Sequence, residues 1–168
     1  MSKFWFTSDE HYGHCGIWKK CRRPGNEDDG DQFLIENHNS VVGPDDYVVH
    51  VGDFSTSGSR DFVLDIVGRL NGIHIFVKGN HDRISAHKTP MANIWCGEVG
   101  GMLIYAKHTP RVSKGRIMEI PTNSLLLHGH WHGRRVVVRP NIYDVGVDNN
   151  NYKPIGLNEI LWRIHVTI

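Results

Sequence analysis

The sequence predicts a single α/β domain in which two packed β-sheets are flanked by helices. Three observations predict it. The chain has 168 residues, a length that fits one compact domain. Buried-type strands alternate with helical patterns in the first half of the chain, whereas short strands dominate the second half. We therefore expect one domain over residues 1–168, with no repeats and no low-complexity segment.

The first half contains an alternation of strands and helices, each bounded by polar, glycine or proline residues. The expected elements, in chain order, are a strand at 3–8, a short helix at 15–21, a Pro/Gly/Asp-rich loop at 24–31, a helix over Phe33 to Val41 ended by Gly43 and Pro44, a strand at 47–51, a helix at 59–70 and a strand at 73–77. Strands that alternate with helices imply parallel crossovers, with helices on the faces of the sheet.

The second half has few helical patterns and reads as mostly β. We expect short strands there at 93–99, 102–107, 116–120, 124–128, 134–139, 142–147 and 160–167. Two packed sheets in one domain accommodate this half together with the first.

Composition and charge exclude several classes of protein. The chain has 19 Lys+Arg against 18 Asp+Glu, so it lacks the basic excess of a protein that coats nucleic acid. Its apolar runs are far shorter than the roughly 20 residues that span a bilayer, and the N-terminal segment is not expected to be a signal peptide. Three cysteines without CxxC spacing argue against a disulfide framework. We expect a cytoplasmic protein with no membrane association.

Histidine is unusually frequent, and the positions of the histidines are informative. The chain has twelve, and several follow predicted strands together with Asp or Asn. Ligands bind at the carboxyl ends of strands in open α/β sheets, and histidine is the commonest metal ligand. Five strand ends carry such groups, in the segments Asp9–His11, Gly52–Asp53, Gly79–Asp82, His108 and His128–His132.

The donors at these strand ends are too many for one ion. Asp9 and His11, two residues apart, project to the same side of an extended chain, as do His130 and His132. The candidate ligands number seven in all: Asp9, His11, Asp53, Asn80, His108, His130 and His132. Two ions about 3.5–4 Å apart, bridged by one carboxylate, would use them all. Mixed oxygen and imidazole donors suit manganese, which we expect, or iron or zinc, better than calcium.

These motifs, in this order, resemble those of the calcineurin-like metallophosphoesterase superfamily. The family's motifs are Asp-x-His, Gly-Asp, Gly-Asn-His-Asp/Glu, a lone His and Gly-His-x-His. They match Asp9-Glu10-His11, Gly52-Asp53, Gly79-Asn80-His81-Asp82, His108 and Gly129-His130-Trp131-His132, which together span about three-quarters of the chain. Each motif alone is a weak signal, but the ordered set of five is highly specific.

The resemblance implies a four-layer α/β/β/α sandwich of two mixed sheets with a dinuclear site at one edge. It assigns Asp9, His11 and His132 to the first ion and Asn80, His108 and His130 to the second, with Asp53 bridging. It implies catalytic roles for His81, which would protonate the leaving oxygen, and for Asp82, which would hold the imidazole of His81. The implied reaction is hydrolysis of a phosphoester by in-line attack of a metal-bridging hydroxide.

The chain departs from the fuller family pattern in two respects. Many members have an arginine shortly after the Gly-Asp motif, but here Arg60 is the first arginine after Asp53. The chain is also near the family's minimum size and leaves no room for a cap domain. Small members often prefer phosphodiesters, so we expect a small phosphodiester or nucleotide-type substrate. The alternatives are a nuclease acting on DNA or RNA and, less favoured, a non-catalytic scaffold that binds a protein.

Other polar residues have less specific interpretations. His14 is expected either at the phosphate site or behind the metal ligands, and His128 either behind the metal ligands or at the edge of the core. Asp144 and Asp148 are interpreted as a polar turn. Trp131 either packs the loop or stacks on a ring of the substrate. Basic residues gather near two of the metal loops and form either a solvated face or a positive rim that attracts phosphates: Lys107, Arg111, Lys114, Arg116, Arg134, Arg135 and Arg139. The remaining histidines are expected to be structural: His38, His50, His74, His87 and His165.

Overall fold

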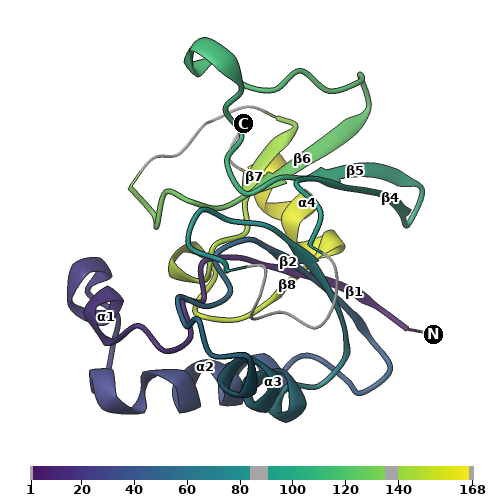
Figure 1. Ribbon diagram of the computed structural model, residues 1–168. Helices are drawn as coiled ribbons and strands as arrows, with labels where there is room; N and C mark the ends of the chain where they lie inside the picture. The colour runs from purple at the N-terminus through teal and green to yellow at the C-terminus, as the bar shows by residue number, and fades with distance from the viewer. Residues whose placement is uncertain (1, 84–90, 135–139, 167–168) are drawn as a thin grey trace.

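The first sheet is built from the strands of the N-terminal half and one short strand from the C-terminal end. The computed structural model describes residues 2–83, 91–134 and 140–166 (Figure 1). The strand order is β3-β2-β1-β8, with β1 at Phe4–Thr7, β2 at Tyr47–Val51, β3 at Ile73–Val77 and β8 at Ile155–Gly156. β1, β2 and β3 are parallel, and β8 is antiparallel to β1. The predicted parallel crossovers are therefore confirmed.

The second sheet is also mixed. Its order is β4-β5-β6-β7, with β4 at Trp95–Val99, β5 at Met102–Ala106, β6 at Ser124–His128 and β7 at Ile142–Asp144. β4 and β5 form an antiparallel hairpin across Gly100 and Gly101, whereas β5, β6 and β7 are parallel. An isolated parallel bridge between Ser8 and Gly146 joins the two sheets near their carboxyl ends.

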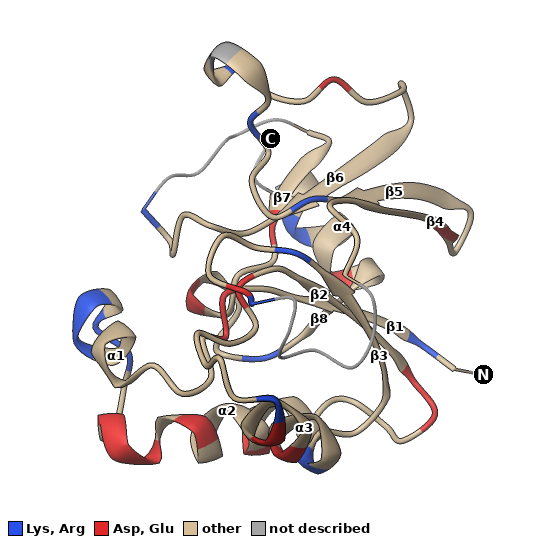
Figure 2. Cartoon of the chain, viewed as in Figure 1, with Lys and Arg blue, Asp and Glu red and all other residues tan. Residues whose placement is uncertain are grey.

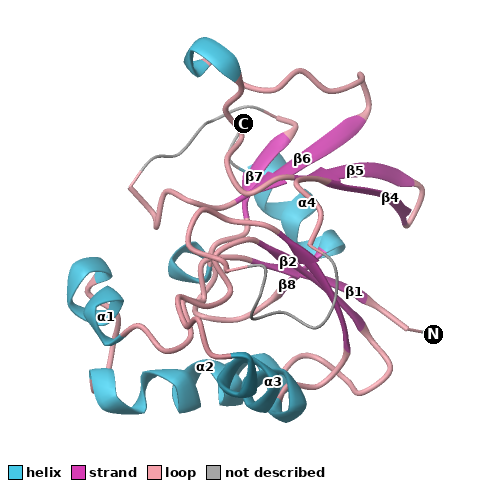
Figure 3. Cartoon of the chain, in the orientation of Figure 1, coloured by secondary structure: helices cyan, strands magenta, loops and turns pink. Residues whose placement is uncertain are grey.

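The described residues form four α-helices beside the sheets: α1 at Cys15–Cys21, α2 at Gly30–Asn39, α3 at Arg60–Arg69 and α4 at Leu157–Val166. α2 and α3 lie side by side on the outer face of the first sheet (Figures 1 and 3). α3 begins where the hydroxyl of Ser59 accepts a hydrogen bond from the amide of Phe62, as expected of an N-cap serine. Two mixed sheets flanked by helices confirm the predicted fold class.

Two hydrophobic cores hold these layers together. The first lies between the sheets, where Phe6 and Val49 meet Ile104 and Leu127, and Ile160 of α4 joins them. The second lies between the first sheet and its helices and contains side chains from α2, α3 and β3, such as Leu34, Ile66 and Phe76. Burial of both faces of the first sheet explains why Val48, Val49 and Val51 of β2 are all apolar instead of alternating with polar residues.

The predicted strand at 160–167 is wrong, because this segment forms the helix α4. Leu157, Ile160 and Ile164 recur at helical spacing and face the core, whereas Trp162 is 64% exposed. The predicted strand at 116–120 is also wrong: Ile117 forms only an isolated bridge with Arg111. The strand expected at 134–139 falls largely outside the described residues, as do His87, Arg135 and Arg139. In the described part of the chain, no helix has the length and apolar character needed to cross a bilayer.

Candidate metal centre

Loops that leave the carboxyl ends of five strands converge at one edge of the two sheets. β1 leads to Asp9 and His11, β2 to Asp53, β3 to Asn80, β5 to His108, and β6 to His130 and His132. Main-chain hydrogen bonds fix the loops to one another. The amides of Asp9 and His11 donate to the carbonyls of Gly52 and Asp53, each at 3.0 Å, and the amide of Gly129 donates to that of His108, also at 3.0 Å.

The first group of converging donors consists of Asp9, His11 and His132. One ligand atom from each lies within 4.8 Å of the others, close enough to hold one cation. Oδ1 of Asp9 lies 3.7 Å from Nε2 of His132. Asp9 and His11 are almost fully buried, which shields the group from water.

The second group consists of Asp53, His108 and His130, whose ligand atoms also lie within 4.8 Å of one another. Nε2 of His108 lies 3.2 Å from Oδ2 of Asp53 and 3.1 Å from Oδ1 of Asn80, so the amide oxygen of Asn80 joins this group. Oδ2 of Asp53 is also 3.6 Å from Nε2 of His11, in the first group. One carboxylate oxygen therefore lies between the two groups, and all seven predicted ligands meet at this edge.

Unsatisfied buried atoms show that these donors fit divalent cations. Among the described residues, Oδ1 of Asp9 and both ring nitrogens of His11 are buried without a hydrogen-bond partner. Buried polar atoms without a partner are costly, by about 1–3 kcal/mol each. Coordination of a cation by Asp9 and His11 would remove much of this cost, and carboxylate with imidazole is a donor set that transition metals bind well.

The backbone is strained at the same residues. Nine non-glycine residues in the described segments have positive φ, and five of them are predicted ligands: Asp9 (61°), His11 (55°), Asp53 (56°), His130 (76°) and His132 (47°). A left-handed conformation costs a non-glycine residue about 1 kcal/mol or more, and such strain is typical of functional sites. The loops are thus held in conformations that direct the ligands inward at the expense of local stability.

The glycines of two motifs allow the loops to approach this closely. A Cβ on Gly79 would overlap the main-chain nitrogen and carboxylate of Asp53, and a Cβ on Gly129 would overlap Ser8 and the carboxylate of Asp9. Any larger residue at either position would push a ligand out of place. The Gly-Asn-His-Asp and Gly-His-x-His motifs therefore need glycine for packing against another metal loop.

The protonation of two of the donors, His11 and Asp53, suits coordination by a neutral imidazole and a bridging carboxylate. Burial lowers the pKa of His11 to about 3, against the opposing effect of Asp53. Burial favours the neutral form of Asp53, but the hydrogen bond and charge of His108 and the amide of His81 outweigh it and lower the pKa of Asp53 to about 2. Near neutral pH, His11 is therefore neutral and Asp53 is ionised.

His81 and Asp82 lie beside the two groups of donors. The main-chain amide of His81 donates to Oδ1 of Asp53 at 2.8 Å, and its ring centroid lies 5.2 Å from that of His11. The side chain of Asp82 is buried, and its Oδ2 accepts from the amides of Asp53 and Gly79, both at 2.8 Å. Asp82 thereby fixes the loop that carries Asp53, and its predicted contact with the imidazole of His81 stays a prediction.

Sequence reasoning missed the role of Arg23 and understated that of Asp148. The guanidinium of Arg23 is fully buried; it donates to the carbonyls of Asp9 (2.6 Å) and Glu10 (2.9 Å) and to Oδ1 of Asp148 (2.8 Å). The polar turn expected at Asp144 and Asp148 is wrong: Asp144 ends β7, and Asp148 lies in a short 3₁₀ helix, Val147–Asn149. Oδ2 of Asp148 lies 2.7 Å from Nδ1 of His132. A pair 125 residues apart leaves no local pattern in the sequence, so no signal pointed to it.

The two histidines expected near the ligands lie there, in different settings. The ring centroid of His14 is 5.7 Å from that of His11, and Nδ1 of His14 is buried without a hydrogen-bond partner. His128 is buried at the end of β6, with its ring packed edge-on against Trp131 at a centroid distance of 4.8 Å. His128 thus supports the loop between the two ligands of the last motif.

A separate histidine cluster lies between α2, which contributes His38, and the first sheet, which contributes His50 and His74. Nδ1 of His50 lies 2.7 Å from a carboxylate oxygen of Glu10, and Nε2 of His50 lies 3.0 Å from Nδ1 of His74. His38 stacks on His50 and contacts the carbonyl of Asn71 at 2.8 Å. Glu10 joins this cluster to the loop of Asp9 and His11, although none of the three histidines belongs to the groups of metal donors.

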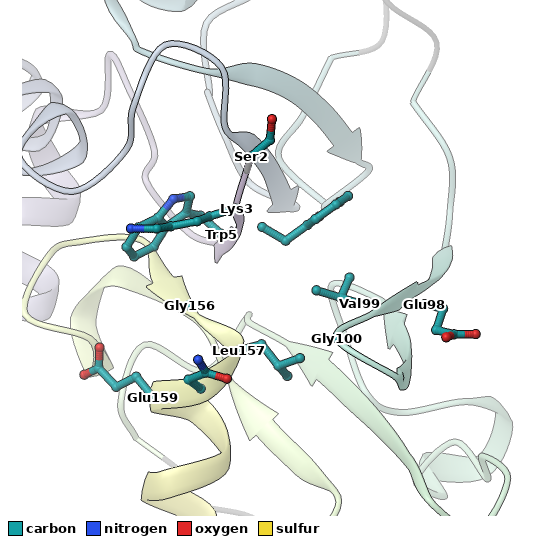
Figure 4. A pocket seen from close by; sticks show the side chains of 11 residues that line it. Ser2, Lys3, Trp5, Glu98, Val99, Gly100, Gly156, Leu157 and Glu159 are labelled. Atoms are coloured by element: carbon teal, nitrogen blue, oxygen red, sulfur yellow. The ribbon is translucent and has the colours of Figure 1, made fainter.

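A cavity of about 360 Å³ opens over the converged ligands and is lined by Asp53, Asn80, His81, His130 and His132, among others. A larger cavity, of about 520 Å³, lies at the opposite end of β1, beside Lys3 and Trp5 (Figure 4). Leu157 and Val99 also line this second cavity, which contains no histidine and none of the predicted ligands. The smaller cavity is therefore the candidate site for substrate.

Comparison with known proteins identifies the family. The model of the calcineurin-like phosphoesterase family matches residues 2–163. The chain belongs to the calcineurin-like phosphoesterase family. The resemblance drawn from the five motifs is thus confirmed.

The chain is similar in sequence to proteins of an archaeon and a phage, and in structure to a bacterial protein. It is 30% identical to the uncharacterized protein MJ1445 of Methanocaldococcus jannaschii, over 96% of this chain and 90% of that protein. It is 28% identical to the Gene 66 protein of Mycobacterium phage L5, over 83% and 82% of the two chains. The crystal structure of the protein AQ665 from Aquifex aeolicus, described as of unknown function, superposes with a TM-score of 0.74 at 24% identity, over 95% and 98% of the chains. This chain therefore shares its fold with AQ665.

Proposed function

We propose that this phosphoesterase hydrolyses a phosphodiester at a centre of two divalent cations, with manganese as the expected metal. The proposal rests on one observation: Oδ2 of Asp53 lies between two groups of donors, 3.6 Å from Nε2 of His11 and 3.2 Å from Nε2 of His108. A carboxylate shared between neighbouring ligand groups is the arrangement a bridged pair of cations needs. When bound, the cations activate a water molecule and neutralise charge on the phosphoryl oxygens.

Metal binding and proton transfer are assigned to different residues of the chain. Asp9, His11 and His132 would hold one cation, and Asn80, His108 and His130 the other, with Asp53 shared. In the hydrolysis an oxygen of water forms a new bond to phosphorus, the bond to the leaving alcohol breaks, and the alcohol oxygen takes a proton. We assign that proton transfer to His81, whose imidazole lies in the cavity over the ligands.

Other residues keep these groups in position. Asp82 fixes the loop of Asp53 through main-chain amides, and Arg23 fixes the loop of Asp9 through main-chain carbonyls. Preorganisation of this kind matters because donors that are already aimed at the developing charge need no rearrangement during the reaction. A cytoplasmic site of action, with a small nucleotide-type substrate, is part of the same proposal.

The experiment is a hydrolysis assay with manganese against bis(p-nitrophenyl) phosphate and p-nitrophenyl phosphate, an aryl diester and an aryl monoester. We expect the diester to be cleaved with the higher kcat/KM, and activity to be lost when EDTA removes the metal. Faster cleavage of the monoester would overturn the diesterase assignment. Full activity in EDTA would overturn the metal-dependent mechanism.

A non-catalytic scaffold is the weaker candidate, because the chain retains every candidate ligand and His81. A nuclease would use the same metal centre and would differ only in its substrate. The side chains that surround the cavity therefore bear on whether the substrate is a nucleic acid.

A further inference from the structure

Three cationic side chains surround the cavity that contains the metal ligands. Lys20, Arg111 and Arg134 line it, together with Thr109 and Trp131. They come from three separate segments: α1, the loop after β5 and the loop after β6. The three cations thus converge on the site from different parts of the sequence, and Figure 2 shows basic residues on α1.

Contacts between these segments define where two of the cations lie. Nη2 of Arg134 donates to the main-chain carbonyl of Lys20 at 3.1 Å, which ties the loop after β6 to the end of α1. The guanidinium of Arg111 lies 5.7 Å from the ring centroid of Trp131, a cation–π distance. Trp131 itself packs against the buried ring of His128. Arg111 and Arg134 are therefore held at the loop that carries His130 and His132.

The positive charge around the cavity exceeds what is needed to neutralise a single phosphate. Asp53 is the one carboxylate among the described residues that line the cavity, and it is shared between the metal groups. The two proposed cations already neutralise the phosphate undergoing hydrolysis. The net charge of the chain is only +1, so three further cations here are a local feature and not a result of general basicity. Arginine guanidinium groups match phosphate oxygens well in geometry.

We infer that the substrate carries at least one phosphate beyond the one that is hydrolysed, and that Lys20, Arg111 and Arg134 bind it. This inference rests on the proposed function and names its substrate class: a nucleotide chain, in which neighbouring phosphates are joined through sugars, or a dinucleotide in which they form a pyrophosphate. In the dinucleotide, water attacks one phosphorus, the bond to the bridging oxygen breaks, and a nucleoside monophosphate leaves in place of the alcohol. Both present a second anionic group close to the scissile one.

The experiment compares a substrate that has one phosphate with two substrates that carry a second phosphate. The dinucleotide dTpdT has a single phosphodiester, and pdTpdT adds a 5′-phosphate; diadenosine diphosphate supplies the pyrophosphate alternative. We expect kcat/KM for pdTpdT or for diadenosine diphosphate to exceed that for dTpdT by about tenfold, since a charged hydrogen bond contributes that much. The arm with the larger preference identifies which source of the second phosphate the site takes.

Variants test whether the named side chains are responsible. Lys20→Ala, Arg111→Ala and Arg134→Ala should each reduce the preference for the additional phosphate by about threefold or more, and their combination should abolish it. Arg116→Ala is the matched control, because Arg116 is an exposed arginine of the same loop as Arg111 that does not line the cavity. It should leave the preference unchanged. Metal content and melting temperature identify variants that fail to fold.

The outcomes separate this inference from the proposed function. Hydrolysis of the aryl diester with equal kcat/KM for dTpdT, pdTpdT and diadenosine diphosphate would overturn the inference and leave the function standing. A preference that survives all three substitutions would also overturn it. A protein that loads metal but cleaves none of these phosphoesters would overturn the proposed function, and the inference with it.

Discussion

Oδ2 of Asp148 lies 2.7 Å from Nδ1 of His132, and Nε2 of the same ring faces Oδ1 of Asp9 at 3.7 Å. Burial acts to raise the pKa of Asp148, but the hydrogen bonds from His132 and Arg23 outweigh it and lower that pKa below its ordinary value. An ionised carboxylate can only accept, so Nδ1 of His132 carries the hydrogen and Nε2 is directed toward the metal site.

Replacing this carboxylate should weaken metal binding although it is not itself a predicted ligand. Asp148→Asn removes the charge that selects the tautomer of His132, and we expect affinity for Mn²⁺ to fall by about 10–100-fold in isothermal titration calorimetry. Asp65→Asn, which changes an exposed carboxylate paired with Arg69 on α3, is the control and should not alter the affinity. Equal affinities for the two variants would contradict this role of Asp148.

Gly129 should tolerate no side chain. A Cβ at this position overlaps Ser8 and the carboxylate of Asp9, so Gly129→Ala should lower both metal content and the melting temperature, at a cost of about 1–3 kcal/mol. Gly68 in α3 has open space around its Cβ position and provides the opposite case. Gly68→Ala should raise the free energy of unfolding by about 0.5–1 kcal/mol. Denaturant unfolding measures both, and a stable Gly129→Ala variant with full metal content would refute the packing argument.

His81 should affect turnover without affecting metal content. Its imidazole lines the cavity but belongs to neither group of donors, so we expect His81→Ala to load metal normally and to lose about 10²–10⁴-fold in kcat toward an aryl diester. His165→Ala, at an exposed histidine of α4, is the matched control. If His81→Ala kept full activity, the assignment of proton transfer to this residue would be wrong.

The buried histidine cluster should make stability depend on pH. Burial, followed by the charge of His50, lowers the pKa of His38 from 6.5 to about 4. The unfolded chain therefore binds a proton at His38 between about pH 6.5 and 4 that the folded chain does not. This residue's contribution to stability falls on acidification, by up to about 1.4 kcal/mol per pH unit in that window.

The test of His38 is a comparison with His38→Gln, because neighbouring groups titrate as well. Burial also lowers the pKa of His74, to about 3, whereas it raises that of Glu10 to about 7, which has the opposite effect on stability. The difference in free energy of unfolding between native protein and His38→Gln isolates the contribution of His38. As the pH falls from 6.5 to 4, the native protein should lose stability relative to His38→Gln. A constant difference would show that His38 does not titrate as described.

The sequence was sufficient to predict the α/β arrangement and the convergence of the ligands, because both follow from strand ends. Parallel strands such as β1 and β2 place their following residues at one edge, so Asp9 and Asp53 could be brought together without coordinates. The helix α4 was misread because its sequence is rich in apolar residues on more than one side: Leu157, Ile160, Leu161 and Ile164 pack in the core, whereas Trp162 is exposed.

The remaining features of the site depend on contacts that no local pattern encodes. Arg23 and Asp148 meet only because α1 folds back on the first metal loop. The positive φ values of His11 and His132 are imposed by neighbouring loops, against the preference of histidine for negative φ. Such long-range restraint is why the positions of the ligands were predictable but their supports were not.

The central claim is that seven donors bind two cations, and the metal content of the protein tests it most directly. Protein loaded with Mn²⁺, freed of excess metal by gel filtration, would be measured by elemental analysis. The account predicts about two manganese ions per chain in the native protein, and a reduced content when the shared carboxylate is removed in Asp53→Ala. A native protein that retains one ion per chain or none would contradict it.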